Sequence, residues 1–201
     1  MKQPATRALF EYWDALRGTR PAPERSDIEP GAIRSCLANT FVLAADAAHG
    51  HPFRIAGTSV CALFGSELTR TPFEMLWAAD ERRAVLDLVQ TVTEDMDGVV
   101  AGVTGRNAAS ETVDLEMILL PLARDHALGD GSAGRVLGAL TALESPYWIG
   151  PRPVQSLHLG DLRFTGAAGA TTLPAGDTPL RGRGFVFYPA AASRISRFFQ
   201  G

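Results

Sequence analysis

The feature that most constrains the fold is a change of hydrophobic period near Gly98. Before it, apolar residues recur at helical spacing after Asp80, on Val85, Leu88, Val89 and Val92. After it, the residues alternate as strands over 99–106, 111–124 and 135–144, with turn-rich loops between them. Parallel strands need long crossover connections, so three strands joined by loops predict an antiparallel sheet.

Two shorter strands are predicted upstream, at 40–45 and 53–56, and short helices fill the stretch from 58 to 97. A further helix is predicted near the N-terminus, with Thr6 as its cap and Gly18 at its end. The order is therefore strand, strand, helices and three strands. The helices form one insertion that can cover one face of the sheet, and the space between the two layers is a natural ligand site.

The net charge of −3 is the sum of two unequal parts. Residues 1–150 carry 13 basic and 20 acidic side chains, while residues 151–201 carry 6 basic and 2 acidic ones. The last 51 residues also contain 12 glycines and prolines. This shift predicts an acidic folded domain followed by a basic extension. Six arginines spread among glycines do not indicate a nucleic-acid partner.

The composition excludes several kinds of chemistry. Lys2 is the only lysine, so a Walker A loop, a pyridoxal-phosphate site and a protein kinase site have no lysine to use. The histidines and cysteines lack zinc-site spacing, and we predict no metal site. The run from Gly129 to Gly134 matches G-x-G-x-x-G, but a strand pattern follows it, which favours a hairpin loop. We expect a protein that is not an enzyme.

The chain shows no sign of export or membrane insertion. No apolar run approaches the ~20 residues that span a bilayer, and the N-terminus lacks a signal-peptide pattern. The two cysteines, Cys36 and Cys61, do not form a disulfide framework. We therefore expect a cytoplasmic protein.

A few polar residues lie where burial is expected. Glu116 lies inside the apolar run 115–122, so it needs either solvent or a partner. Arg54 and Arg106 lie on predicted strands and are candidates to pair with Glu116 or with an anionic ligand. His49 and His51 flank a predicted turn, and we expect both to be exposed.

The N-terminal helix carries an apolar stripe of Phe10, Trp13 and Leu16. It can pack on the sheet of its own chain or on the same helix of a second subunit. The sequence leaves both arrangements open.

Several segments together resemble the single-domain bacterial PAS proteins of the PAS_5 family, which occur mainly in alphaproteobacteria. They are Leu9–Gly18, Arg25–Ile28, Phe53–Thr58 with Cys61 and Phe64-Gly65, Leu76-Trp77, and Glu116 before Leu119–Leu122. The resemblance covers roughly residues 5–145. It implies an α+β PAS fold: a five-stranded antiparallel sheet with short helices over one face. The implied parts are N-terminal helices at 1–38, a PAS core at 39–148 and an extension at 149–201.

The resemblance also implies a function: a non-catalytic sensory or regulatory protein that binds a small molecule between sheet and helices. Its output would be a change in contacts with a signalling partner protein. The alternative is an adaptor module with a packed core and no ligand. The candidate ligand-binding residues are Cys61, Phe64, Trp77, Arg106, Glu116 and Met117. A homodimer would form through the stripe of Phe10, Trp13 and Leu16.

No cofactor is identified. The segment Gly105–Ala108 resembles the start of the flavin motif of light-oxygen-voltage domains, but Ala108 stands where that motif has the photoadduct cysteine. An axial haem histidine would be expected on the helix after Asp80, and that segment contains none.

Overall fold

The computed structural model of the protein describes residues 1–123, 134–165, 180–182 and 185–187. The helices are α1 (Pro4–Arg17), α2 (Thr58–Phe64) and α3 (Arg82–Asp95), and the short 3-10 turns are η1 (Arg25–Asp27), η2 (Pro30–Ile33), η3 (Leu37–Asn39), η4 (Ala47–His49) and η5 (Phe73–Leu76). The strands are β1 (Thr40–Ala44), β2 (Phe53–Ala56), β3 (Val99–Asn107), β4 (Thr112–Leu122), β5 (Arg135–Ala142), β6 (Val154–Phe164), β7 (Leu180–Gly182) and β8 (Phe185–Phe187). Residues 129–133 of the predicted glycine-rich loop and most of the extension after 165 lie outside the described residues.

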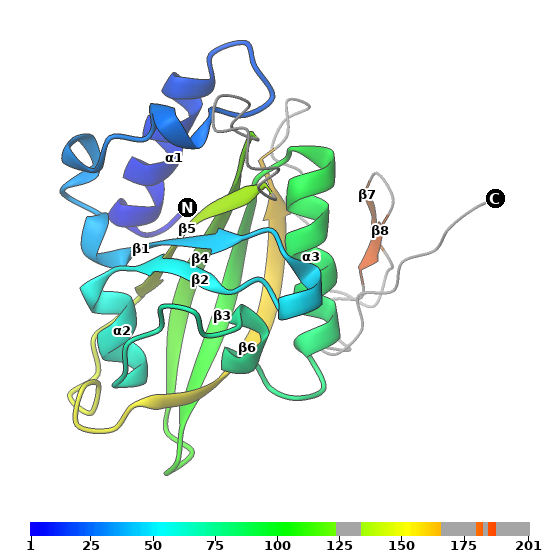
Figure 1. Ribbon diagram of the computed structural model, residues 1–201. Helices are drawn as coiled ribbons and strands as arrows, with labels where there is room; N and C mark the ends of the chain where they lie inside the picture. Colours follow the sequence, from blue (N-terminus) through cyan, green and yellow to red (C-terminus); the bar gives the residue numbers. More distant parts are fainter. Residues whose placement is uncertain (124–133, 166–179, 183–184, 188–201) are drawn as a thin grey trace.

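The main sheet is antiparallel, with the strand order β2-β1-β5-β4-β3-β6 (Figure 1). The resemblance implied five strands, and the structure corrects that number to six. The additional strand, β6, belongs to the segment expected to be an extension, yet it pairs with β3 over the whole length of that strand. The sheet therefore continues to Phe164, beyond the expected limit of the core at residue 148.

Contacts on both sides of β6 fix it to the domain. Leu157 and Leu162 are buried in the core. On its outer edge, the backbone N–H of Leu159 donates to the buried carboxylate of Glu81 at 2.6 Å, and Ala78 N–H donates to the Leu157 carbonyl at 3.0 Å. The segment before α3 thus covers an edge that would otherwise present free backbone groups.

Two hydrophobic cores lie on opposite faces of the sheet (Figure 1). We call the face toward α2, η5 and α3 the inner face, and the face toward α1 the outer face. Successive strand residues point to opposite faces, so β4 contributes to both cores. Its inner residues are Leu115, Met117 and Leu119, and its outer ones are Ile118, Leu120 and Leu122.

The first helix begins earlier than the sequence suggests. Gln3 is the N-cap and Pro4 occupies the first helical position, where its missing N–H has no cost. Thr6, the expected cap, lies inside the first turn with a buried side chain. Gly18, at φ 56°, ends the helix as expected.

Candidate functional site

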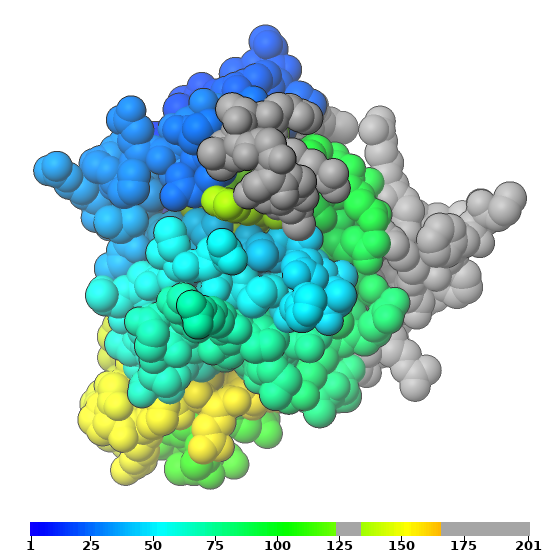
Figure 2. Space-filling view, in the orientation of Figure 1, coloured from blue at the N-terminus to red at the C-terminus, as the bar shows by residue number. Residues whose placement is uncertain are grey.

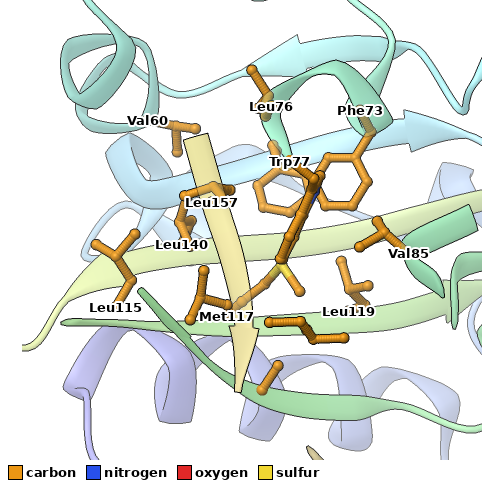
Figure 3. Packing of buried hydrophobic residues seen from close by; sticks show 14 of the residues in the cluster. Val60, Phe73, Leu76, Trp77, Val85, Leu115, Met117, Leu119, Leu140 and Leu157 are labelled. Atoms are coloured by element: carbon orange, nitrogen blue, oxygen red, sulfur yellow. The ribbon is translucent and has the colours of Figure 1, made fainter. Parts of the chain in front are cut away.

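Four of the six candidate ligand-binding residues lie on the inner face of the sheet. Trp77 and Met117 are both 1% exposed, and they project into the same interior space from η5 and β4 (Figure 3). Cys61 and Phe64 lie on α2 and are partly buried against this core. All four residues therefore belong to the inner core or pack against it, and their role in binding a ligand stays a prediction.

Aromatic rings fill the centre of this interior. Phe41, Phe53, Phe73 and Trp77 form a chain whose neighbouring ring centroids lie 5.5 to 5.9 Å apart. Most of these pairs meet edge to face, an arrangement that aromatic rings favour. The protein's own aromatic side chains thus fill this part of the space between sheet and helices.

Trp77 also places a polar atom in this packing. Its Nε1–H is buried and has no hydrogen-bond partner among the described residues. A buried donor without an acceptor costs about 1–3 kcal/mol. An entering hydrogen-bond acceptor would satisfy this N–H.

Glu116 and Arg106 do not reach the inner face. Glu116 is 5% exposed on the outer face, because it alternates with Met117 along β4. Its carboxylate accepts the backbone N–H groups of Lys2 at 2.7 Å and of Gln3 at 2.9 Å. It thereby holds the start of α1, where the helix dipole also favours a negative charge.

Arg106 is exposed near the far end of β3, where it lies opposite Thr112 and Ser156. The β3 residue opposite Glu116 is Gly102, so Arg106, one of the two candidate partners of Glu116, does not pair with it. The Gly105–Ala108 segment ends β3, and the Asn107 side chain accepts the N–H groups of Ala109 and Glu111. Asn107 therefore organises a turn here.

The N-terminal stripe packs on the sheet of its own chain. Trp13 is 2% exposed, and its Nε1–H donates to the Pro121 carbonyl at 2.8 Å. Phe10 stacks on Trp13 at 6.2 Å, and Phe10 and Leu16 are partly buried against the outer core. Trp13 is therefore not free to meet a second subunit, and a dimer contact through Phe10 and Leu16 stays a prediction.

The sequence reasoning missed an open hollow beside β2. It has a volume of about 490 Å³ and is lined by Asp46, Ala48, His49, Pro52, Phe53, Arg54, Arg70, Pro72 and Glu74. Arg54 was noted as a candidate for an anionic ligand, but Arg70 carried no signal. These residues come from separate segments that only the folded chain brings together.

His51 was expected to be exposed, and it is instead 2% exposed. The backbone of His51 is left-handed, at φ 52°, and its N–H donates to the Asp46 carbonyl at 2.8 Å. Burial lowers the pKa of His51 below its usual value, although the Ala44 carbonyl and the carboxylates of Asp46 and Glu74 oppose the shift.

Within the described ranges, no three His, Cys, Asp or Glu residues lie together as a metal site would require. Burial raises the pKa of the Cys36 thiol, so that thiol is a poor nucleophile.

No helix among the described residues combines the length and the apolar character needed to cross a bilayer.

The sequence matches the PAS_5 family, described as a PAS domain, over residues 1–141. Solved structures similar to this chain include a variant of the light-oxygen-voltage protein RsLOV, with 15% identity, a TM-score of 0.41 and coverage of 55% of this chain and 63% of that one. A light-oxygen-voltage domain studied with a flavin analogue has 16% identity, a TM-score of 0.42 and coverage of 58% and 85%. The PAS domain of an HTR-like protein from Haloarcula marismortui has 15% identity, a TM-score of 0.40 and coverage of 56% and 90%.

This chain thus spans less than two thirds of the RsLOV chain that it resembles. A comparison with curated protein sequences gave no match. The family match covers more than half of the chain and agrees with the strand order and the position of the helices. The chain belongs to the PAS domain family, whose members are generally sensory or regulatory modules.

Proposed function

We propose that this PAS domain is a non-catalytic adaptor that regulates a signalling protein by direct contact and binds no ligand in its interior. The observation that carries the proposal is the packing around Trp77. This side chain and its aromatic neighbours occupy the space between sheet and helices. Activity in the bacterial cytoplasm is part of the same proposal.

One observation favours a second candidate function, a sensor that binds a small molecule inside. The buried Nε1–H of Trp77 has no acceptor within the described residues, and a ligand with an acceptor group would satisfy it. Such a ligand would displace part of the aromatic packing and would contact Cys61, Phe64 and Met117. Its binding energy would have to exceed the packing that it replaces.

Native mass spectrometry of the purified full chain separates the two functions. For the adaptor, we expect the mass of the polypeptide without any small molecule, as monomer or dimer. A stoichiometric small molecule that survives purification would contradict the adaptor and support the sensor.

The substitution Trp77→Phe tests the same point without knowledge of a ligand. It keeps an aromatic ring and removes the unsatisfied donor. For a packed adaptor, urea unfolding should show a free energy within about 1 kcal/mol of the wild type, because the lost volume is offset by relief of the orphaned N–H.

Trp13→Phe is the matched control, because the Trp13 N–H donates to the Pro121 carbonyl. That substitution removes a satisfied bond, so it should cost at least about 1 kcal/mol more than Trp77→Phe. Equal losses in the two variants would mean that the Trp77 donor has an acceptor, which is the result expected for a bound ligand.

A further inference from the structure

We propose that the hollow beside β2 is an effector site for a small anion, a molecule that carries a phosphate or carboxylate group. This site lies outside the PAS interior and does not depend on the adaptor function. Its volume of about 490 Å³ falls within the usual range for small-molecule sites. The cyan and blue-green atoms near the centre of Figure 2 show where β2 and the following segment reach the surface.

Backbone hydrogen bonds hold the two arginines of the hollow on neighbouring segments. Phe53 N–H donates to the Thr71 carbonyl at 3.0 Å, and Arg70 N–H donates to the Phe53 carbonyl at 2.8 Å. Arg54 follows Phe53 directly, so Arg54 and Arg70 lie on adjacent chain segments and line the same hollow. Two guanidinium groups that line one hollow can together bind an oxyanion.

Neither arginine has a carboxylate partner among the described residues. Four described arginines, Arg17, Arg20, Arg83 and Arg152, form ion pairs with Asp or Glu, while Arg54 and Arg70 share the unpaired state of several other surface arginines. Arg54 and Arg70 are both exposed, so their guanidinium groups are available to a ligand.

The backbone of Arg70 is a second observation in favour of a site. Its φ is 71°, in the left-handed region that glycine or asparagine occupies at lower cost. An arginine in this position is strained locally, and strain of this kind concentrates at functional sites.

The two acidic residues that also line the hollow, Asp46 and Glu74, limit which anions fit. Asp46 pairs with His49 at 2.8 Å, so that carboxylate already has a partner. The Glu74 carboxyl group lies against Gly50, where a Cβ atom would approach it to 2.7 Å. Glu74 repels an anion that extends across the hollow, and it can accept a hydrogen bond from a hydroxyl or amino group of the same ligand.

Isothermal titration calorimetry tests the site with two probes at low ionic strength, inorganic phosphate and succinate. The stronger of the two shows whether the natural ligand carries phosphate or carboxylate. We expect saturable one-to-one binding by the wild type and at least about tenfold weaker binding by Arg54→Gln. Arg34→Gln is the matched control, because Arg34 is exposed and lies outside the hollow.

Two further variants make the test independent of net charge and of folding. Glu74→Gln removes a repulsive carboxylate and should tighten binding of the stronger probe. Arg70→Gly should weaken binding about tenfold while the melting temperature stays equal or rises, because glycine accepts the left-handed backbone. The proposal is overturned if neither probe binds saturably, or if Arg34→Gln weakens binding as much as Arg54→Gln does.

Discussion

Among the single residues, two buried polar side chains have structural roles that the sequence did not predict. Glu116 lies under the start of α1 and accepts the backbone N–H groups of Lys2 and Gln3, so a distant strand fixes the chain just before the helix. His51 is enclosed at the turn between β1 and β2. Each residue leads to a prediction.

Replacement of Glu116 by Ala should lower the free energy of unfolding by about 2 kcal/mol or more, because two hydrogen bonds to a charged group are lost. Asp114→Ala is the control, since Asp114 lies two residues away on the same face of β4 and is exposed. It should change stability by no more than about 0.5 kcal/mol. Urea unfolding measures both variants, and equal effects would show that Glu116 does not hold the helix.

The stability of the protein should fall as the pH drops below about 6.5, the usual pKa of histidine. Since burial lowers the pKa of His51 in the folded state, the unfolded chain takes up a proton there that the folded chain does not. Thermal melts across this range should show a smaller loss for His51→Asn than for the wild type.

His49→Asn is the matched control for that measurement, since His49 is exposed in the same turn. It should keep the pH dependence of the wild type in this range. If His49→Asn flattens the profile as much as His51→Asn does, burial of His51 is not the cause.

Glu116, Met117 and His51 show why part of the candidate site could not be predicted from the sequence. Glu116 and Met117 were assigned to one site, although neighbours on a strand point to opposite faces. The alternation therefore allowed only one of them to face the helices, but it did not say which. The buried His51 has a left-handed backbone, which the residue types in this turn do not predict.

At the scale of elements, the strands followed the predicted ranges closely. β2 matches its predicted range of 53–56, and β3 and β5 begin at the predicted residues 99 and 135. Alternating apolar residues and flanking turn residues are local signals, and they suffice to place strands. The pairing of β6 with β3 is a long-range contact, so its place in the sheet could not be deduced from the sequence of β6.

That pairing makes β6 part of the folded unit. A chain that ends at residue 150 would leave the outer edge of β3 unpaired and would remove the buried Leu157 and Leu162. We expect this truncated chain to be unfolded, or to melt far below the full-length protein, in circular dichroism. A chain that ends at residue 165 keeps these contacts and should melt cooperatively. Similar melting of the two truncated chains would contradict the role of β6.

At the scale of the whole molecule, one sheet separates two cores. The inner core surrounds Trp77, and the outer core joins α1 to the sheet through Leu9 and Trp13. The central strands belong to both cores, so neither core can persist when the sheet is lost. We expect tryptophan fluorescence and far-ultraviolet circular dichroism to report one coincident urea transition. Two separated transitions would show that the cores unfold independently.

The alternation of β4 has a consequence for regulation. Met117 faces the interior, its neighbour Glu116 binds the backbone of Lys2 and Gln3 just before α1, and one peptide bond joins Glu116 to Met117. A displacement of the strand on one face therefore moves a contact on the other. The packing of the interior and the contact near α1 therefore depend on two adjacent residues of the same strand. We therefore expect a partner that binds α1 and shifts it to change the stability of the packing around Trp77 as well, since any coupling between two sites is reciprocal.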